Sequence, residues 1–268
     1  MYFSGAFTLN FKQPFQLTAG TISPIYIDNR VIQSDQNHWR IAISLMVATI
    51  YSEIERTEYD AISGGSDADF AFSYPVAWEM NVPHIAIRKE EKEHGRGARL
   101  MGRVRSGWRT VHVADLITDG GSALMWLNAL RSEKVTMTHY VSLFDRMQGG
   151  KANLEQEGVV LHSLSSMNDE FFQIGIRGGF LTKEDYEGSL KPYLLEPRAW
   201  ACDFLRRNPE FIRDRITVRD GQLVSRILDL FMNERAYPEL KSEFGERIRS
   251  WLQKKEVKQS VPEFAYEP

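Results

Sequence analysis

Short apolar runs alternate with stretches of helical spacing along the first two thirds of the chain. The runs are rich in β-branched residues and predict strands, while apolar residues at every third or fourth position predict the helices between them. The predicted strands cover residues 26–27, 59–62, 84–87, 111–114 and 135–144, and the predicted helices cover residues 36–50, 70–80 and 123–130. This alternation is typical of an α/β fold in which a parallel sheet carries helices on both faces.

Two of the predicted strands are followed by glycine pairs, Gly64-Gly65 and Gly120-Gly121. In a parallel sheet the carboxyl ends of the strands meet at one edge, and ligands bind in the crevice outside that edge. We therefore expect both glycine pairs to lie at a ligand site.

The pattern changes near Thr182, after which only helical spacing remains. Apolar positions predict helices over residues 184–195, 198–207, 223–232 and 240–252, with prolines between and within them. We predict a boundary between residues 1–182 and a helical extension, residues 183–268. The last residues, 254–268, are expected to form a mobile tail.

Charge and composition narrow the class of protein. The chain has 33 Lys and Arg against 36 Asp and Glu, so its net charge of −3 argues against a general nucleic-acid binder. Its one cysteine, Cys202, excludes a disulfide within the chain. Residues 1–10 do not resemble a signal peptide, and the longest apolar stretch, residues 41–51, is too short to span a membrane. We expect a cytoplasmic protein with no membrane partner, in which any anion site is a local concentration of basic groups.

The first segment that could carry chemistry is residues 111–122. A predicted buried strand ends at Asp115, and a glycine turn then opens a helix. Backbone N–H groups in such a turn form a nest for a phosphate, which would lie near Asp115. A plain connection from strand to helix, with Ser122 as the helix cap, fits the same spacing.

The second segment is a run of mixed charge after the strand at residues 84–87. Residues 88–105 hold seven Lys or Arg and three Glu, with glycines among them, so we expect an exposed loop. A charge run of this kind is often only a solvated surface. It is also the local basic concentration that an anion site in this chain requires.

Two further positions have both a functional and a structural interpretation. Arg146 follows Asp145 at the end of a predicted strand, where a guanidinium can bind a carboxylate in a fork or form a structural pair with its neighbour. Tyr26 can border a ligand or be a half-buried aromatic residue of its strand.

In this order, these segments resemble the type I phosphoribosyltransferases, and the orotate phosphoribosyltransferases most. The likeness spans about the first 180 residues. Residues 111–122 resemble the motif that binds phosphoribosyl pyrophosphate (PRPP), with Asp115 at the second of two acids. The matching loop positions are Thr118, Gly120, Gly121 and Ser122. Ala114 stands where the first acid is expected, and Asp119 stands where a small residue is expected.

The basic run contains Arg-Lys-x-x-Lys-x-His-Gly, which is similar to the catalytic loop of orotate phosphoribosyltransferases. The resemblance implies that Arg88, Lys89, Lys92 and His94 bind diphosphate. In that family the loop reaches into the site of the partner subunit, which implies a homodimer.

Three other segments extend the resemblance. Gly64 and Gly65 take the place of the family's diphosphate loop, although Asp69 replaces a glycine there and Asp67 an uncharged residue. The segment from residue 17 to 28 is similar to the family's N-terminal hood, in which Tyr26 would border the pyrimidine. Arg146 matches the arginine that meets the carboxylate of orotate.

The resemblance implies a type I phosphoribosyltransferase fold with a small N-terminal hood, and a reaction that transfers ribose 5-phosphate from PRPP to orotate with Mg²⁺. Lys92, His94 and Asp115 would be the catalytic residues. Two alternatives stay open: transfer to another base, and a weakened or inactive relative that binds a ligand or regulates. Asp67, Asp69 and Asp119 would repel phosphate, point away from it or hold Mg²⁺.

Overall fold

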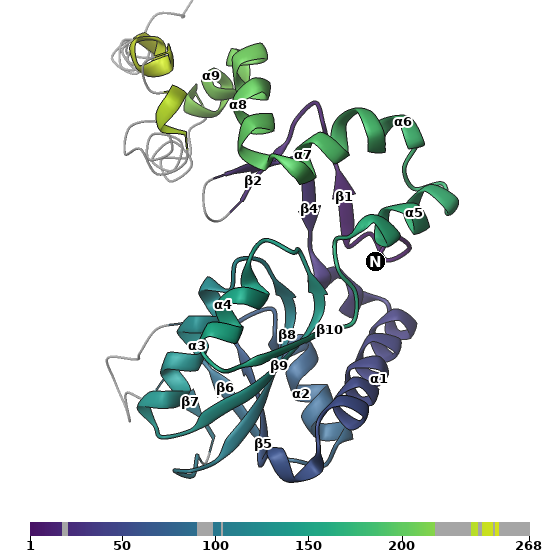
Figure 1. Ribbon diagram of the computed structural model, residues 1–268, viewed down its shortest axis with the longest axis vertical. Coiled ribbons are helices and arrows are strands. Elements are labelled where there is room, and N and C mark those ends of the chain that lie inside the picture. Colours follow the sequence, from purple (N-terminus) through teal and green to yellow (C-terminus); the bar gives the residue numbers. More distant parts are fainter. Residues whose placement is uncertain are drawn as a thin grey trace, which may run out of the picture. The chain divides into compact units, whose positions relative to one another are not determined.

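The structure is a computed structural model, and it describes residues 1–17, 21–89, 99–102, 104–217, 237–240, 243–248 and 250–251 (Figure 1). The chain divides into two compact units. The first comprises Met1–Phe7 and Ile27–Leu181, and the second comprises Thr8–Tyr26 and the described part of the chain from Thr182 onward. The predicted division at residue 182 stays a prediction, and the structure groups residues 8–26 with the extension.

A six-stranded sheet forms the centre of the first unit. Its strands lie in the order β10-β9-β8-β5-β6-β7, and all neighbours are parallel except β6 and β7. The bounds are β5 Ala61–Gly65, β6 His84–Ile87, β7 Leu100–Met101, β8 Arg109–Ile117, β9 Thr136–Asp145 and β10 Val160–Ser163. The predicted parallel α/β fold is therefore confirmed, with one short antiparallel strand added at an edge.

Helices cover both faces of this sheet, as the alternating pattern predicts (Figure 1). Helices α1 (Gln36–Glu53) and α2 (Phe70–Glu79) share one hydrophobic core with the strand residues Ile62, Val111 and Val141. Helices α3 (Gly121–Ser132) and α4 (Gly150–Gln156) share another with Ala61, Ile85 and Tyr140. These two apolar layers hold the ends of the strands in fixed register.

Local sequence explains how the connecting elements begin and end. The Asp35 carboxylate accepts the backbone N–H groups of Asn37 and His38, so it caps α1 as the sequence predicts. Short 3-10 helices, η1 (Asn29–Ser34) and η2 (Arg56–Glu58), precede α1 and β5. After β10, the Asn168 side chain caps α5 (Asp169–Arg177).

The second unit is built from short strands and helices. Strand β2 (Phe15–Gln16) pairs antiparallel with β3 (Ile22–Ser23), and β1 (Phe7–Leu9) pairs with β4 (Ile25–Ile27) where the chain crosses the unit boundaries. The helical elements are α6 Lys183–Asp185, η3 Tyr186–Leu190, α7 Lys191–Leu195, α8 Pro197–Arg207, α9 Pro209–Thr217 and η4 Pro238–Leu240. Residues 243–248 are also helical. The predicted helix over residues 223–232 and the predicted tail lie outside the described residues.

The core of the second unit explains why residues 8–26 belong to it. Ile22 is buried among Ala201, Leu205 and Phe244, and its N–H donates to the Tyr237 hydroxyl at 2.8 Å. The hydrophobic surface of α8 is therefore covered in part by a segment that lies far away in the sequence.

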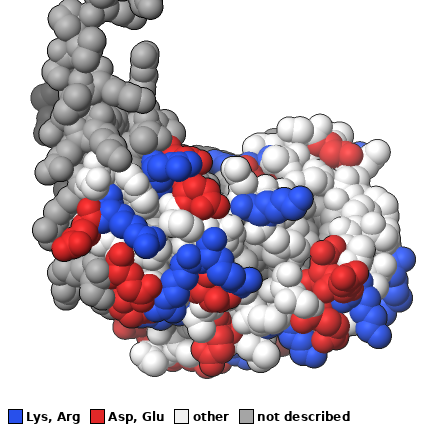
Figure 2. Space-filling view, turned by 90° about the horizontal axis from the view of Figure 1, so that it is seen from above, with Lys and Arg blue, Asp and Glu red and all other residues white. Residues whose placement is uncertain are grey.

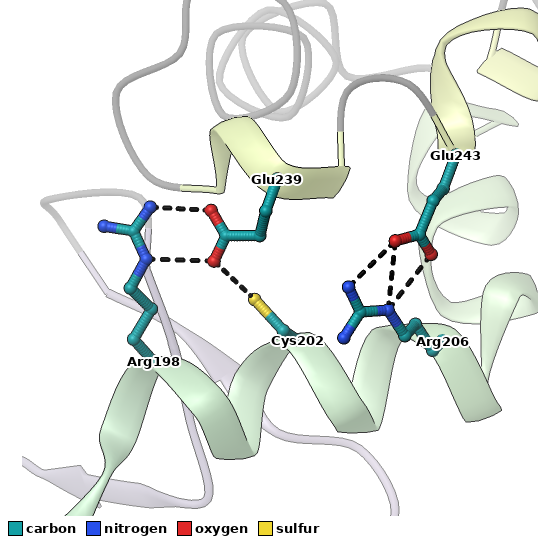
Figure 3. A network of polar contacts seen from close by, with 5 residues as sticks. All are labelled: Arg198, Cys202, Arg206, Glu239 and Glu243. Atoms are coloured by element: carbon teal, nitrogen blue, oxygen red, sulfur yellow. Dashed lines mark hydrogen bonds and ion pairs between the residues drawn. The ribbon is translucent and has the colours of Figure 1, made fainter.

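Ion pairs link α8 to the residues that follow position 236 (Figure 3). Arg198 binds the Glu239 carboxylate with two hydrogen bonds of 3.0 and 2.7 Å, and Arg206 binds Glu243 at 2.8 Å. The Cys202 thiol donates to Glu239 at 3.0 Å, and burial together with this carboxylate raises the pKa of Cys202 to about 12. A thiol with so high a pKa is a poor nucleophile, so Cys202 has a structural role here.

Lys and Arg are interspersed with Asp and Glu over the described residues of the face in Figure 2. This mixture agrees with the nearly balanced charge of the sequence. None of the helices in the described part of the chain combines the length and apolar character that crossing a membrane requires.

Candidate functional site

The candidate site lies at the carboxyl ends of the parallel strands. Gly64 and Gly65 end β5, Arg88 and Lys89 follow β6, Asp115 lies near the end of β8, and Arg146 follows β9. Because β5, β6, β8 and β9 are parallel, these residues share one edge of the sheet. The structure thus brings together six residues that the sequence analysis selected from four separate segments.

The glycine turn after β5 lies beside the start of the basic segment. The N–H of Ser66 donates to the Ile87 carbonyl at 2.8 Å, and the N–H of Lys89 donates to the Ser66 hydroxyl at 3.1 Å. The Lys89 side chain is exposed. Lys92 and His94 lie outside the described residues, so their predicted diphosphate contacts stay predictions.

Both glycines of this turn are required by close packing. A Cβ at Gly64 would overlap the Ser73 side chain, and a Cβ at Gly65 would overlap the Trp126 indole. Ser73 lies on α2 and Trp126 is buried on α3, so the end of β5 is packed between these two helices. The peptide bond between Ser66 and Asp67 is cis, and the Asp67 side chain is exposed.

The turn between β8 and α3 has one residue with a positive φ, and one backbone N–H at the start of α3 is engaged. Gly120 has a φ of 83°, which favours glycine, and it is the N-cap residue of α3. The Asp119 carboxylate accepts the Gly121 N–H at 3.0 Å. The expectation that Ser122 caps the helix is wrong, because Ser122 is the second residue of α3.

Asp69 occupies a place that the sequence did not predict. Its carboxylate accepts the N–H of Gly65 at 3.1 Å and the N–H of Asp115 at 3.2 Å, and it lies 3.5 Å from His112 Nε2. The residue is only 8% exposed. The carboxylate is therefore turned back onto the sheet and engaged with backbone donors.

The charge state of Asp115 follows from this arrangement. Burial, and then the neighbouring Asp69 carboxylate, raise the pKa of Asp115 to about 8. The backbone of Asp115 is held on its other side by Asn29, whose side-chain amide donates to the Asp115 carbonyl at 2.6 Å. Asp115 is half-buried, so it remains accessible at the edge.

Arg146 and Tyr26 have different surroundings. Arg146 is 4% exposed. Its backbone N–H donates to the Ile117 carbonyl at 2.9 Å, and this hydrogen bond joins the end of β9 to β8. Asp145 accepts the Met147 N–H at 2.7 Å, and burial raises the pKa of Asp145. Tyr26 is half-buried and belongs to the second unit, where its ring lies 5.2 Å from that of Phe15.

No three or more His, Cys, Asp or Glu side chains within the described residues form a group that could hold a metal ion. Mg²⁺ commonly binds through one or two carboxylates together with water and substrate phosphates. Asp69 and Asp115 lie close together at this edge of the sheet.

Comparison with known proteins agrees with this geometry. The chain is 33% identical over 193 residues to the orotate phosphoribosyltransferase of Dinoroseobacter shibae, a match that covers 71% of this chain and 84% of that protein. Orotate phosphoribosyltransferase from Aeropyrum pernix superposes with a TM-score of 0.56 at 26% identity, covering 66% of this chain and 95% of that one. The UMP synthase of Leishmania donovani gives a TM-score of 0.60 at 26% identity, covering 68% of this chain but only 38% of the longer protein. No family model matches the chain.

The fold and the edge of parallel strands define a type I phosphoribosyltransferase, which is a class of glycosyltransferase. Within that class, the chain belongs to the orotate phosphoribosyltransferase family.

Proposed function

We propose that the protein transfers ribose 5-phosphate from PRPP to orotate and releases diphosphate, as in pyrimidine nucleotide biosynthesis. One observation carries this proposal within the chain itself: the turn at Gly120, the turn at Gly65 and the start of the basic segment share one edge of the sheet. Membership of the family supplies the substrate class.

In this reaction the bond between C1′ of PRPP and the diphosphate oxygen breaks, and a bond from an orotate ring nitrogen to C1′ forms. That nitrogen loses its proton to the departing diphosphate or to water. The electron pair of the broken bond leaves with diphosphate. Catalysis of such a step consists mainly of positioning and of stabilising charge. Asp115 would hold the ribose hydroxyls, and the backbone N–H groups of the turn around Thr118, Gly120 and Ser122 would hold the 5′-phosphate.

The remaining predicted residues have complementary tasks. Arg88, Lys89, Lys92 and His94 would neutralise the departing diphosphate, together with Mg²⁺ bound to the diphosphate oxygens. Arg146 would meet the orotate carboxylate if its buried guanidinium turns toward the ligand.

Three features of the proposal rest on the family resemblance or the sequence. Tyr26 would border the pyrimidine ring, and the basic loop would serve the site of a second subunit in a homodimer. The cytoplasmic location stays a prediction from the sequence.

The test is an assay of the full chain with PRPP, Mg²⁺ and orotate, in which diphosphate release and the orotate absorbance are followed together. Uracil and adenine in place of orotate give matched controls for the acceptor base. We expect release that depends on orotate. Release with another base alone would assign a different acceptor, and no release with any base would contradict the proposal.

A second candidate function is favoured by one observation, the replacement of the motif's first acid by Ala114. On this alternative the protein binds PRPP without turning it over and acts as a ligand-binding or regulatory protein. Calorimetric titration with PRPP and Mg²⁺ separates the two, because binding without orotate-dependent release supports the alternative.

A further inference from the structure

Two departures from the family pattern meet in space. Ala114 stands where the motif has its first acid, and Asp69 stands where the diphosphate loop has a glycine. The two positions are far apart in the sequence. In the structure they lie on neighbouring strands and the turns that follow them, because β5 and β8 are paired.

Ala114 is a buried residue on the face of β8 that packs against α3 and α4. His112 and Ala114 alternate with Val113, so they point to the same face of the sheet. Ala114 belongs to the core that contains Tyr140, and the His112 ring stacks on Tyr140 with 5.0 Å between centroids. Alanine contributes only a methyl group to this layer, so position 114 brings no carboxylate to it.

Asp69 brings a carboxylate to this place from the turn after β5. Asp69 is the N-cap residue of α2, yet its side chain does not cap that helix. Instead it lies 3.5 Å from His112 Nε2 and accepts the N–H of Asp115 at 3.2 Å. Asp69 therefore contacts the residue that follows Ala114 in β8, and His112 on the same face of the strand.

The same carboxylate joins two segments of the candidate site. One oxygen accepts the N–H of Gly65 in the glycine turn, and the other accepts the N–H of Asp115 at the end of β8. A charged acceptor makes stronger hydrogen bonds to backbone donors than a neutral one. Removing it would leave two buried N–H groups without this acceptor.

We propose that Asp69 is a positioning residue that takes over the part of the missing first acid, fixing Asp115 and the Gly65 turn in the geometry that PRPP requires. This inference rests on the proposed function. The family sequence pattern places no acid at this position, so the role is particular to chains that combine Ala114 with Asp69.

A side-chain hydrogen bond also joins the Asp115 and Asp69 carboxyls. Burial, and then the neighbouring Asp69 carboxyl, raise the pKa of Asp115 to about 8, so Asp115 keeps its proton near neutral pH. Arg30 opposes the shift and Asp28 adds to it, and His112 and Tyr140 are the other titratable groups that face the pair. A protonated Asp115 carries no negative charge, which reduces its repulsion of a phosphorylated substrate.

A matched pair of asparagine variants tests the proposal. Asp60, at the opposite end of β5, accepts the Arg109 N–H at 2.8 Å and so makes the same kind of bridge to β8 away from the site. We expect Asp69→Asn to raise KM for PRPP about tenfold while KM for orotate stays within about twofold. Asp60→Asn should change neither value. Equal effects of the two variants would reduce Asp69 to a structural bridge and overturn the proposal.

A second experiment moves the carboxylate from position 69 to position 114. Asp69→Gly restores the glycine of the family pattern and should weaken PRPP binding, and adding Ala114→Asp to it should recover most of the loss. A double variant that binds PRPP no better than Asp69→Gly would contradict the exchange of positions. Thermal unfolding of each variant separates loss of folding from loss of binding.

Carbon-13 NMR titration of the ligand-free protein tests the carboxyl pair independently of turnover. We expect one aspartate carboxyl to titrate near pH 8 in the wild type and at a lower pH in Asp69→Asn, because the contribution of Asp69 is removed while that of burial remains. Ordinary titration of Asp115 in the wild type would overturn the pairing. Absence of both turnover and PRPP binding in the wild type would instead overturn the proposed function, and the titration would then still decide whether the pair exists.

Discussion

The Asp119 carboxylate accepts a hydrogen bond from the backbone N–H of Gly121 at 3.0 Å, so one backbone donor at the start of α3 is already bonded to an acid. In an anion nest this N–H would point at a bound phosphate. The Asn153 side chain donates to the Asp119 carbonyl at 2.8 Å and fixes the backbone of the same residue. If a phosphate binds this turn, as we propose, Asp119 competes with it for the Gly121 N–H.

We expect Asp119→Ala to tighten PRPP binding by about tenfold, because it frees the Gly121 N–H and removes a negative charge. The loss of the hydrogen bond from the Gly121 N–H should lower the free energy of unfolding by about 1 kcal/mol. Calorimetry with PRPP and Mg²⁺ and urea unfolding measure the two effects. Glu79→Ala is the control. It removes an exposed carboxylate at the C-terminal end of α2 and should leave PRPP binding unchanged. Weaker binding with a higher Mg²⁺ requirement would show that Asp119 holds the metal instead.

The close packing at Gly65 leads to a prediction about the free energy of unfolding. We expect Gly65→Ala to lower the free energy of unfolding by about 1–3 kcal/mol, because the added methyl group overlaps the buried Trp126 ring. Gly188→Ala is the matched control, since a Cβ there meets no atom within 4 Å. Urea unfolding monitored by tryptophan fluorescence compares them. Equal stability of the two variants would mean that Trp126 moves aside without cost.

The basic segment carries a prediction about turnover. We expect Lys92→Ala or His94→Ala to lower kcat roughly a hundredfold, because each would remove a group that stabilises the departing diphosphate. The free energy of unfolding should stay within about 0.5 kcal/mol of the wild type, since the sequence predicts an exposed loop. Lys183→Ala, an exposed lysine of the extension, is the control. Unchanged kcat would return both residues to the solvated-surface interpretation.

Much of this arrangement could be predicted from the sequence, because it follows local patterns. Strand and helix periods give the parallel sheet, and the glycine pairs mark the ends of β5 and β8. The direction of the Asp69 side chain could not be predicted, because spacing places it in a loop without indicating which donors it meets. Strand β7 has two residues and no detectable pattern. The burial of Ile22 among helices of the extension depends on contacts across nearly the whole chain.

The raised pKa of Asp115 predicts how stability changes with pH. The folded protein keeps a proton on this carboxyl up to about pH 8, whereas the unfolded chain releases it near pH 3.8. The contribution of Asp115 to stability therefore falls as pH rises from about 4 to about 8 and is constant above that range.

We expect Asp115→Asn to gain stability relative to the wild type as pH rises from 5 to 8, and the difference to level off at higher pH. Urea unfolding at each pH measures it. Asp60→Asn is the control, because the backbone N–H of Arg109 lowers the pKa of Asp60. The difference in unfolding free energy between Asp60→Asn and the wild type should therefore stay constant from pH 5 to 8. A flat difference for Asp115→Asn as well would mean that Asp115 is ionised in the folded protein at neutral pH.

Restoring the acid that the motif lacks should harm this protein as long as Asp69 is present. Ala114 is fully buried, so Ala114→Asp would add a third carboxyl beside Asp69 and Asp115. We expect it to lower the free energy of unfolding by roughly 2–4 kcal/mol at pH 7 and to weaken PRPP binding.

Ala114→Asn separates charge from size, because the amide has nearly the same volume as the carboxyl. A new buried carboxyl has a raised pKa, so the part of the cost that comes from its charge is present above that pKa and disappears as pH falls. The two variants should therefore be equally stable near pH 4, and Ala114→Asp should be the less stable at pH 7 and above. In an Asp69→Gly background the cost of Ala114→Asp should shrink, because the space and the excess charge beside Asp115 are relieved together. An undiminished cost in that background would mean that positions 69 and 114 do not interact.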